Sequence, residues 1–118
     1  MAEVFFEFLT EDKSVVLLYE EVDRDNYSKV VLVSNKKIIY EWTTGGRGQN
    51  ITVYTGYKLN DGNWHMVNIE RNSMEVMVMV DRKQMMGTKI KNANIEKDPL
   101  FIFSELEVNL VLFAVNRY

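Results

Sequence analysis

The sequence has 118 residues, of which 47% are hydrophobic and 26% are charged, which is too apolar for a disordered segment and too interrupted by charge for a membrane span. The net charge of -3 argues against nucleic acid as a partner, and the absence of cysteine excludes disulfide bonds and thiol chemistry. We therefore expect one soluble, folded domain over residues 1–118.

Hydrophobic and polar residues alternate along most of the chain, a pattern typical of β-strands with one buried face. Near the N-terminus, Val4, Phe6 and Phe8 fall on one side of the first predicted strand, and Glu3 and Glu7 fall on the other. Further strands, separated by short polar or glycine-rich turns, are predicted over residues 14–20, 27–34, 36–43, 50–55, 64–71 and 74–80.

The run 74–80 is almost entirely apolar, which predicts a central strand covered on both faces. A helix is the competing interpretation, but valine at every second position and the lack of a helix cap favour a strand. Two more strands are predicted over 100–103, which Pro99 opens, and over 108–115. The fold predicted is all-β, an antiparallel two-sheet sandwich of the jelly-roll, concanavalin-like type, with a closed barrel as the second choice.

One stretch is more specific than the alternation. The sequence LNDGNWHMVNIER at 59–71, followed by VMVMVD at 76–81, resembles the central signature of laminin-G-like domains, which occur in laminins, neurexins, agrin and Slit. Residues 4–8, 15–19 and 29–33 are similar to that family's opening strands. The resemblance implies one domain over 1–118 that is truncated at both ends and lacks the usual C-terminal strand, because Ala114 and Val115 stand where a glycine pair is expected.

The family resemblance also implies a function. It predicts an extracellular, non-enzymatic binding module for cell adhesion or for receptor or matrix recognition, either secreted or part of a cell-surface protein. The expected ligand is a protein or a glycan, without insertion into a membrane.

The residues of the signature are interpreted as folding residues. Asp61 and Gly62 supply a turn, Trp64 contributes a large buried surface, and Val67 and Ile69 point inward. His65 is the sole histidine, and the sequence indicates no serine or carboxylate partner for it. We therefore expect a packed, hydrogen-bonded histidine rather than a catalytic base or a metal ligand.

Some laminin-G-like domains hold calcium at one rim of the sandwich, and the resemblance places the two side-chain ligands at Asn26 and Ser104. Asp25 would add a carboxylate, and backbone carbonyls near residues 44 and 102 would complete a partial shell. So few charged ligands predict weak binding, with a dissociation constant of roughly 0.1 to 1 mM or weaker. The alternative is that this acidic segment is simply a solvated turn.

Two acceptor sequences for N-linked glycans, Asn26-Tyr27-Ser28 and Asn50-Ile51-Thr52, lie in polar stretches, so Asn26 and Asn50 are candidate glycosylation sites. The scattered lysines and arginines are interpreted as a solvated surface. The methionines at 66, 77 and 79 are either core or an adaptable apolar contact surface.

A lectin-like or carbohydrate-active β-sandwich is the alternative function. Glu105 and Glu107 share one face of a predicted strand or turn, but paired spacing alone is a poor signal for hydrolysis. The aromatic residues that discriminate between the two functions are Tyr40, Trp42, Tyr54 and Tyr57. Exposure of these rings in a row favours sugar binding, whereas their burial favours an adhesion module.

Overall fold

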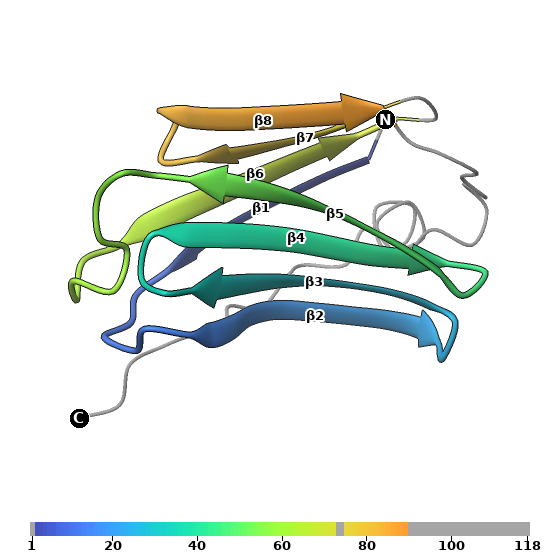
Figure 1. Cartoon of the computed structure of the whole chain (residues 1–118), viewed down its shortest axis with the longest axis horizontal. Coiled ribbons are helices and arrows are strands. Elements are labelled where there is room, and N and C mark those ends of the chain that lie inside the picture. The colour runs from blue at the N-terminus through green and yellow to red at the C-terminus, as the bar shows by residue number, and fades with distance from the viewer. Residues whose placement is uncertain (1, 73–74, 90–118) are drawn as a thin grey trace.

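The computed structural model describes residues 2–72 and 75–89, and these residues form eight β-strands and no helix (Figure 1). The strands are β1 (Ala2–Phe8), β2 (Val15–Asp23), β3 (Asn26–Val33), β4 (Lys37–Thr44), β5 (Arg47–Tyr54), β6 (His65–Arg71), β7 (Glu75–Val80) and β8 (Gln84–Lys89). Within these ranges there is consequently no helix of the length and apolarity that a membrane crossing needs.

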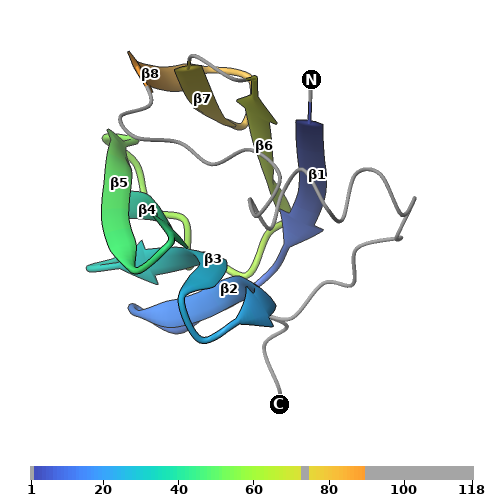
Figure 2. The same cartoon turned by 90° about the vertical axis from the view of Figure 1, so that its right-hand side faces the viewer.

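The strands are divided between two antiparallel sheets, which confirms the predicted sandwich. One sheet has the order β1-β6-β7-β8 and the other has the order β2-β3-β4-β5. Figure 2 shows the two sheets as facing layers. In chain order, β1 of the first sheet is followed by the four strands β2 to β5 of the second sheet. Strand β6 then returns to the first sheet, where it pairs with β1.

The core lies between the sheets because alternate side chains of each strand point inward. In β1 the buried residues are Val4, Phe6 and Phe8, as the alternation predicted, and in β6 Val67 and Ile69 are fully buried. The largest buried side chains of the other sheet include Trp42, Tyr40, Leu17, Leu18, Leu32 and Ile38. Burying one such aliphatic or aromatic side chain contributes about 1.5 to 3 kcal/mol to folding, so this interface is the main source of stability.

A charged residue is also part of this core. Arg71 on β6 is only 4% exposed, and its guanidinium carbon lies 4.8 Å from the ring centre of Trp42 on β4. The guanidinium thus contacts an aromatic ring of the opposite sheet, a cation–π arrangement that is strongest where water is excluded. The contact joins the two sheets near the ends of β4 and β6.

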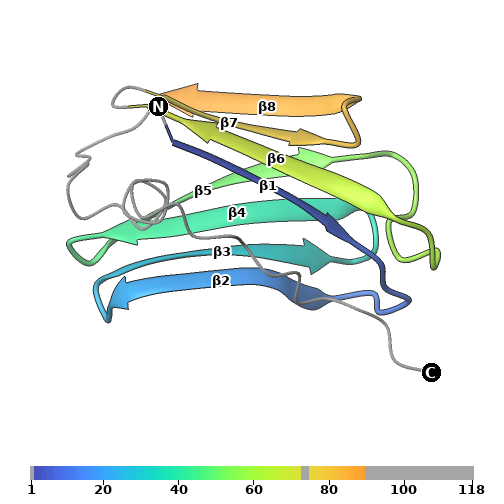
Figure 3. The ribbon, with the colours of Figure 1, turned by 180° about the vertical axis from the view of Figure 1, so that it is seen from behind.

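The turns gather at the two ends of the sandwich (Figures 1 and 3). We call one the His65 end; it holds the β3–β4 and β7–β8 turns and the loops that follow β1 and β5. We call the other the Asn26 end; it holds the β2–β3 and β4–β5 turns. Candidate ligand-binding residues lie at both ends.

Four features of the strands differ from the sequence prediction. Strand β8 was not predicted, β2 ends at Asp23 rather than at residue 20, and β5 begins at Arg47 rather than at residue 50. Strand β7 is internal, as expected, but only its valine face is buried, and Met77 and Met79 on the opposite face are half-buried. The predicted strands 100–103 and 108–115, with Pro99, Ala114 and Val115, lie outside the described residues.

Candidate binding site

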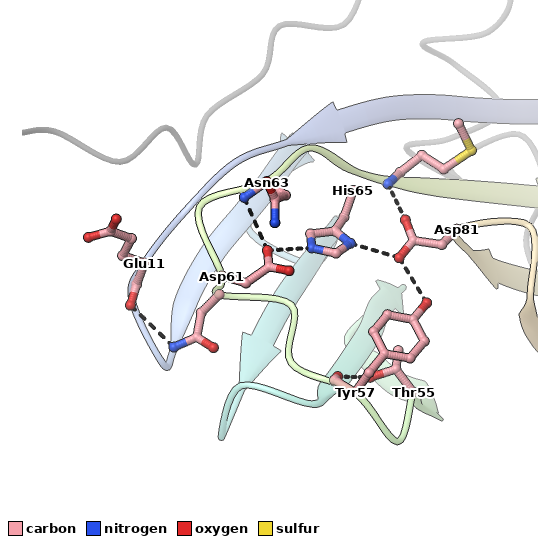
Figure 4. Close-up of polar contacts among 9 residues, drawn as sticks. Glu11, Thr55, Tyr57, Asp61, Asn63, His65 and Asp81 are labelled. Atoms are coloured by element: carbon pink, nitrogen blue, oxygen red, sulfur yellow. Dashed lines mark hydrogen bonds and ion pairs between the residues drawn. The ribbon is translucent and has the colours of Figure 1, made fainter.

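The side chain of His65 lies between two carboxylates at the His65 end (Figure 4). Its Nδ1 is 2.8 Å from Oδ2 of Asp81, and its Nε2 is 2.8 Å from Oδ1 of Asp61. An ionised carboxylate only accepts hydrogen bonds, so both contacts are hydrogen bonds when both ring nitrogens carry a proton. The arrangement therefore favours the imidazolium form of His65.

The loop before β6 brings Asp61 into this position. Gly62 adopts a left-handed conformation, with φ of 75°, and its N–H donates to the carbonyl of Thr10 at 3.2 Å. The N–H of Asn63 donates to Oδ1 of Asp61 at 3.1 Å, which closes a local side-chain turn. The predicted Asp61-Gly62 turn is confirmed, and it orients the carboxylate toward a histidine four residues later.

The second carboxylate belongs to the β7–β8 turn. Asp81 and Arg82 have φ of 54° and 58°, and the N–H of Lys83 donates to the carbonyl of Val80 at 3.0 Å. These features define a hairpin turn with two left-handed residues, a position where glycine or asparagine is usual and aspartate is tolerated. The side chain of Asp81 also connects this turn to neighbouring segments.

Asp81 makes those contacts with three groups. Besides the His65 ring, the N–H of Met66 donates to Oδ1 at 2.8 Å and the hydroxyl of Tyr57 donates to Oδ2 at 2.8 Å. The N–H of Asp81 also donates to the carbonyl of Met66 at 3.0 Å. One carboxylate thus joins the loop after β5, the start of β6 and the β7–β8 turn.

The electrostatics of the cluster follow from burial and from these hydrogen bonds. Burial lowers the pKa of His65, but the hydrogen bonds and charges of Asp61 and Asp81 outweigh it, so the pKa is raised above 6.5. Burial raises the pKa of Asp81, but the N–H of Met66 and the His65 ring prevail and lower it. For Asp61, slight burial is likewise outweighed by His65 and Asn63, and the pKa falls to about 2. Burial and the Asp81 carboxylate raise the pKa of Tyr57, which keeps its hydroxyl protonated as a donor.

The prediction that His65 is hydrogen-bonded is confirmed, but the expectation that it has no carboxylate partner is wrong. Asp81 was missed because its proximity to His65 depends on the pairing of β6 with β7, and this pairing cannot be read from the positions of the two residues in the sequence. Both ring nitrogens face carboxylates, so the His65 ring connects the loop before β6 to the β7–β8 turn.

The prediction that Trp64 is buried is also wrong, because 57% of this residue is exposed. Strand alternation explains the difference, since Val67 and Ile69 face the core and residue 64 has the parity of the outward-facing Met66. Trp64 lines an open pocket of about 390 Å³ together with Glu7, Tyr57, His65, Met66, Asp81, Arg82 and Lys83. Tyr57, His65 and Asp81 form one wall of this pocket. The exposed side chains of Trp64, Arg82 and Lys83 border it.

At the Asn26 end, the side chain of Asn26 is 3% exposed and connects two hairpin turns. Its Oδ1 accepts from the N–H of Gly45 at 2.9 Å, and its Nδ2 donates to Oδ1 of Asp23 at 2.7 Å. Asp25 is exposed, and its carbonyl accepts from the N–H of Gly46 at 3.0 Å. The structure thus places Asn26 in a structural role between the β2–β3 and β4–β5 turns.

The proposed calcium ligands are only partly described. Ser104, like Glu105 and Glu107, lies outside the described residues. Across 2–72 and 75–89, no three histidine or acidic side chains converge in a way that would hold a metal ion. Oδ1 of Asn26 accepts a hydrogen bond from Gly45 and the carboxylate of Asp25 is exposed, and calcium binding at this end stays a prediction.

Comparison with known proteins identifies the family. A family model described as "Laminin G domain" matches residues 8–109. This chain belongs to the laminin G domain family. It is 33% identical to neurexin-4 of Drosophila melanogaster over 79 residues, which are 67% of this chain and 6% of neurexin-4. It is 29% identical to the laminin subunit alpha of Drosophila melanogaster over 112 residues, which are 94% of this chain and 3% of that subunit.

Solved structures support the same fold. Domains LG4-5 of the mouse laminin alpha1 chain match with a TM-score of 0.65 and 17% identity, covering 77% of this chain and 24% of that one. The LG1-3 region of the laminin alpha2 chain matches with a TM-score of 0.65 and 19% identity, covering 79% of this chain and 18% of that one. The chain therefore spans a small part of each relative, and the sandwich of this laminin G domain is common to them.

The four aromatic residues that discriminate between functions do not form an exposed row in this laminin G domain. Tyr40 and Trp42 are buried, with their ring centres 5.1 Å apart. Tyr57 is half-buried and hydrogen-bonded to Asp81, while Tyr54 is exposed on β5. An exposed row of rings was expected of a sugar-binding face and buried rings of an adhesion module, so this arrangement favours an adhesion module.

The two candidate glycosylation sites have different surroundings. Asn50 is exposed on β5, opposite Glu41 of β4, where a glycan would extend into solvent. The amide of Asn26 is buried and both of its polar atoms are hydrogen-bonded. The folded domain is thus compatible with a glycan at Asn50, whereas a glycan at Asn26 would displace the contact between the two hairpin turns.

Proposed function

We propose that this laminin G domain is an extracellular, non-enzymatic module that recognises a protein or glycan ligand in cell adhesion or in contact with the matrix. The match of the family model over residues 8–109 carries the proposal. The similarity to neurexin-4 and to the laminin subunit alpha supports an extracellular setting. Because the chain spans 6% and 3% of these relatives, the identity of the ligand is not transferred from them.

The architecture supports recognition through loops held on a rigid scaffold. Eight paired strands fix the positions of the turns, and the contacts of Asp81 and Asn26 restrain the turns at the two ends. Loops on a rigid scaffold are the usual location of binding residues, because their side chains vary without disturbing the core. Binding by such a surface requires no reactive group.

A binding screen tests this function. The secreted chain, biotinylated and assembled on streptavidin, is applied to an array of extracellular protein domains and to a glycan array, with calcium and with chelator. We expect saturable binding to at least one protein or glycan. The control is Val78→Asp, which places a charge in the core and should abolish folding and binding together. Turnover of a glycan substrate by the parent protein would contradict the non-enzymatic function.

The Asn26 end remains our prediction for weak calcium binding, with Asp25 as its accessible carboxylate. Calcium would have to compete with the hydrogen bond from Gly45 for Oδ1 of Asn26. A calcium titration of the parent and of Asp25→Asn, followed by amide chemical shifts, measures this directly. No step of the proposed recognition depends on calcium.

A further inference from the structure

The pocket beside Trp64 continues onto the outer face of the sheet that contains β1, β6 and β7. A second pocket, of about 430 Å³, adjoins it and is lined by Glu3, Phe5, Met66, Asn68, Met79 and Arg82. Met66 and Arg82 line both pockets. We call the combined surface the Trp64 groove; its central residues are Phe5, Trp64, Met66, Met79 and Arg82.

The groove exposes side chains that usually pack against a partner. Phe5 is 45% exposed and Trp64 is 57% exposed, and Met66 and Met79 lie half-buried beside them. Aromatic residues, methionine and arginine are enriched in the cores of protein interfaces, and tryptophan and arginine are enriched among the residues that dominate binding energy. Methionine also adapts its shape to different apolar side chains. The floor of the groove therefore suits apolar side chains of another protein.

One border of the groove carries two cations on a restrained turn. Arg82 and Lys83 are exposed, and neither forms an ion pair with a described residue. The ammonium of Lys83 lies 5.5 Å from the ring centre of Tyr57, and Arg82 is held in a left-handed conformation beside Asp81. Because the contacts of Asp81 fix the turn before a ligand arrives, less conformational freedom is lost on binding.

The opposite border carries acids. Glu3 and Glu7 are exposed on β1, so the groove is cationic along the β7–β8 turn and anionic along β1. A polyanionic sugar chain would meet these carboxylates and would leave the apolar floor uncovered. A peptide with one acidic residue beside apolar residues avoids both problems.

We propose that the Trp64 groove binds an extended peptide segment of a protein partner, with an acidic side chain against Arg82 and Lys83 and a neighbouring apolar side chain against Phe5, Trp64, Met66 and Met79. This inference rests on the proposed function as a recognition module and specifies the chemistry of one protein ligand. It places that ligand at the His65 end and on the adjoining sheet face, away from the Asn26 end.

The test is a titration of the 15N-labelled chain with the peptide acetyl-GDLFG-amide, followed by amide chemical shifts. We expect shifts confined to residues near Phe5, Trp64, Met66, Met79 and Arg82. The matched peptide acetyl-GNLFG-amide, which lacks the negative charge, should bind about tenfold more weakly because a charge-assisted contact is replaced by a neutral one. The peptide acetyl-GDSSG-amide, which lacks the apolar side chains, should bind more weakly as well.

Variants of the chain complete the test. Trp64→Ala and Arg82→Gln should each weaken binding of acetyl-GDLFG-amide while retaining the dispersed amide spectrum of a folded domain. The matched controls Tyr54→Ala and Arg24→Gln change an exposed aromatic residue and an exposed cation outside the groove, and they should bind like the parent.

Three outcomes would overturn the inference. They are absence of shifts at the groove at millimolar peptide, equal binding of the aspartate and asparagine peptides, and shifts at the groove with a sulfated disaccharide but not with the peptides. The proposed function is judged separately by the array. If the parent, Trp64→Ala and Arg82→Gln bind the same array partner equally, the function stands and this site is wrong.

Discussion

The carboxylate of Asp81 and the imidazole of His65 lie 2.8 Å apart, although the two residues are 16 positions apart in the chain. The register of the β6–β7 hairpin explains the contact, because Val67 pairs with Val80 and the residues just outside this pair become neighbours. Asp81 then serves as the acceptor for a ring, a hydroxyl and a backbone N–H. We therefore expect the geometry of the β7–β8 turn, and with it the position of Arg82, to depend on this carboxylate.

The first prediction concerns pH. Because the pKa of His65 is raised above 6.5 in the folded protein, the stabilisation that its charge provides is complete below about 6.5 and is lost as the pH rises through the folded pKa. The pKa values of Asp61 and Asp81 are lowered, so their contributions are present above about 3.8 and are lost as the pH falls toward their folded values. The cluster is expected to stabilise the domain most between roughly pH 4 and 6.5.

Urea unfolding of the parent and of His65→Gln, at pH values from about 4 to well above 6.5, measures the effect. The difference in free energy of unfolding between the two proteins should shrink as the pH rises above about 6.5. Titration of distant carboxylates affects both proteins equally and cancels in the difference. A difference that stays constant with pH would mean that the ring is not held in its charged form.

The second prediction concerns the conformation of the β7–β8 turn. Asp81→Asn retains a residue type that tolerates a positive φ and keeps one acceptor oxygen, whereas Asp81→Ala loses all three side-chain hydrogen bonds. We expect a loss of about 1 to 2 kcal/mol for Asn and about 3 kcal/mol or more for Ala, measured by urea unfolding. Asp12→Ala, at an exposed position, is the control and should change little. Equal losses in the two Asp81 variants would show that the turn does not depend on these contacts.

The third prediction compares the two tryptophans. Trp42 is fully buried and contacts Arg71 and Tyr40, so Trp42→Ala should cost about 3 to 5 kcal/mol of stability. Trp64 is largely exposed, so Trp64→Ala should cost about 1 kcal/mol or less. Thermal and urea unfolding give both values, and Trp42→Phe provides a milder change if Trp42→Ala does not fold. A loss for Trp64→Ala as large as that for Trp42→Ala would place Trp64 in the core.

The sequence predicted the strands because alternation is a local property of the chain. Val67 and Ile69 differ by two positions, so a pleated backbone points both inward whatever the neighbouring strand is. The turn at Gly62 was equally local. Strand β8 escaped prediction because the turn before it contains no glycine and its six residues are held by backbone pairing with β7.

The contacts of the candidate site depend on pairing between strands and so were harder to predict. The burial of Trp64 was inferred from its size. Trp64 is three positions from the buried Val67, and an odd spacing along a strand places two residues on opposite faces, so the alternation indicated the outer face. Asp61 was accessible to sequence reasoning as a residue four positions before His65. Asp81 was not, because its approach requires the register of β6 against β7, and a shift of one residue would send it to the other face.

The last prediction concerns glycosylation and distinguishes the two acceptor sequences by the folded environment of their asparagines. Asn50 is exposed on β5, whereas Asn26 is buried and hydrogen-bonded through both side-chain atoms. Secretion of the chain from eukaryotic cells should therefore give one N-linked glycan, detected as a mass that N-glycosidase removes. Thr52→Ala, which destroys the second acceptor sequence but leaves Asn50 in place, should abolish this mass. Ser28→Ala, which destroys the first acceptor sequence but leaves the hydrogen bonds of Asn26 intact, should leave this mass unchanged. Loss of the glycan in Ser28→Ala, or its persistence in Thr52→Ala, would assign the glycan to Asn26. That result would imply that the contact between Asn26 and Gly45 opens before or during folding.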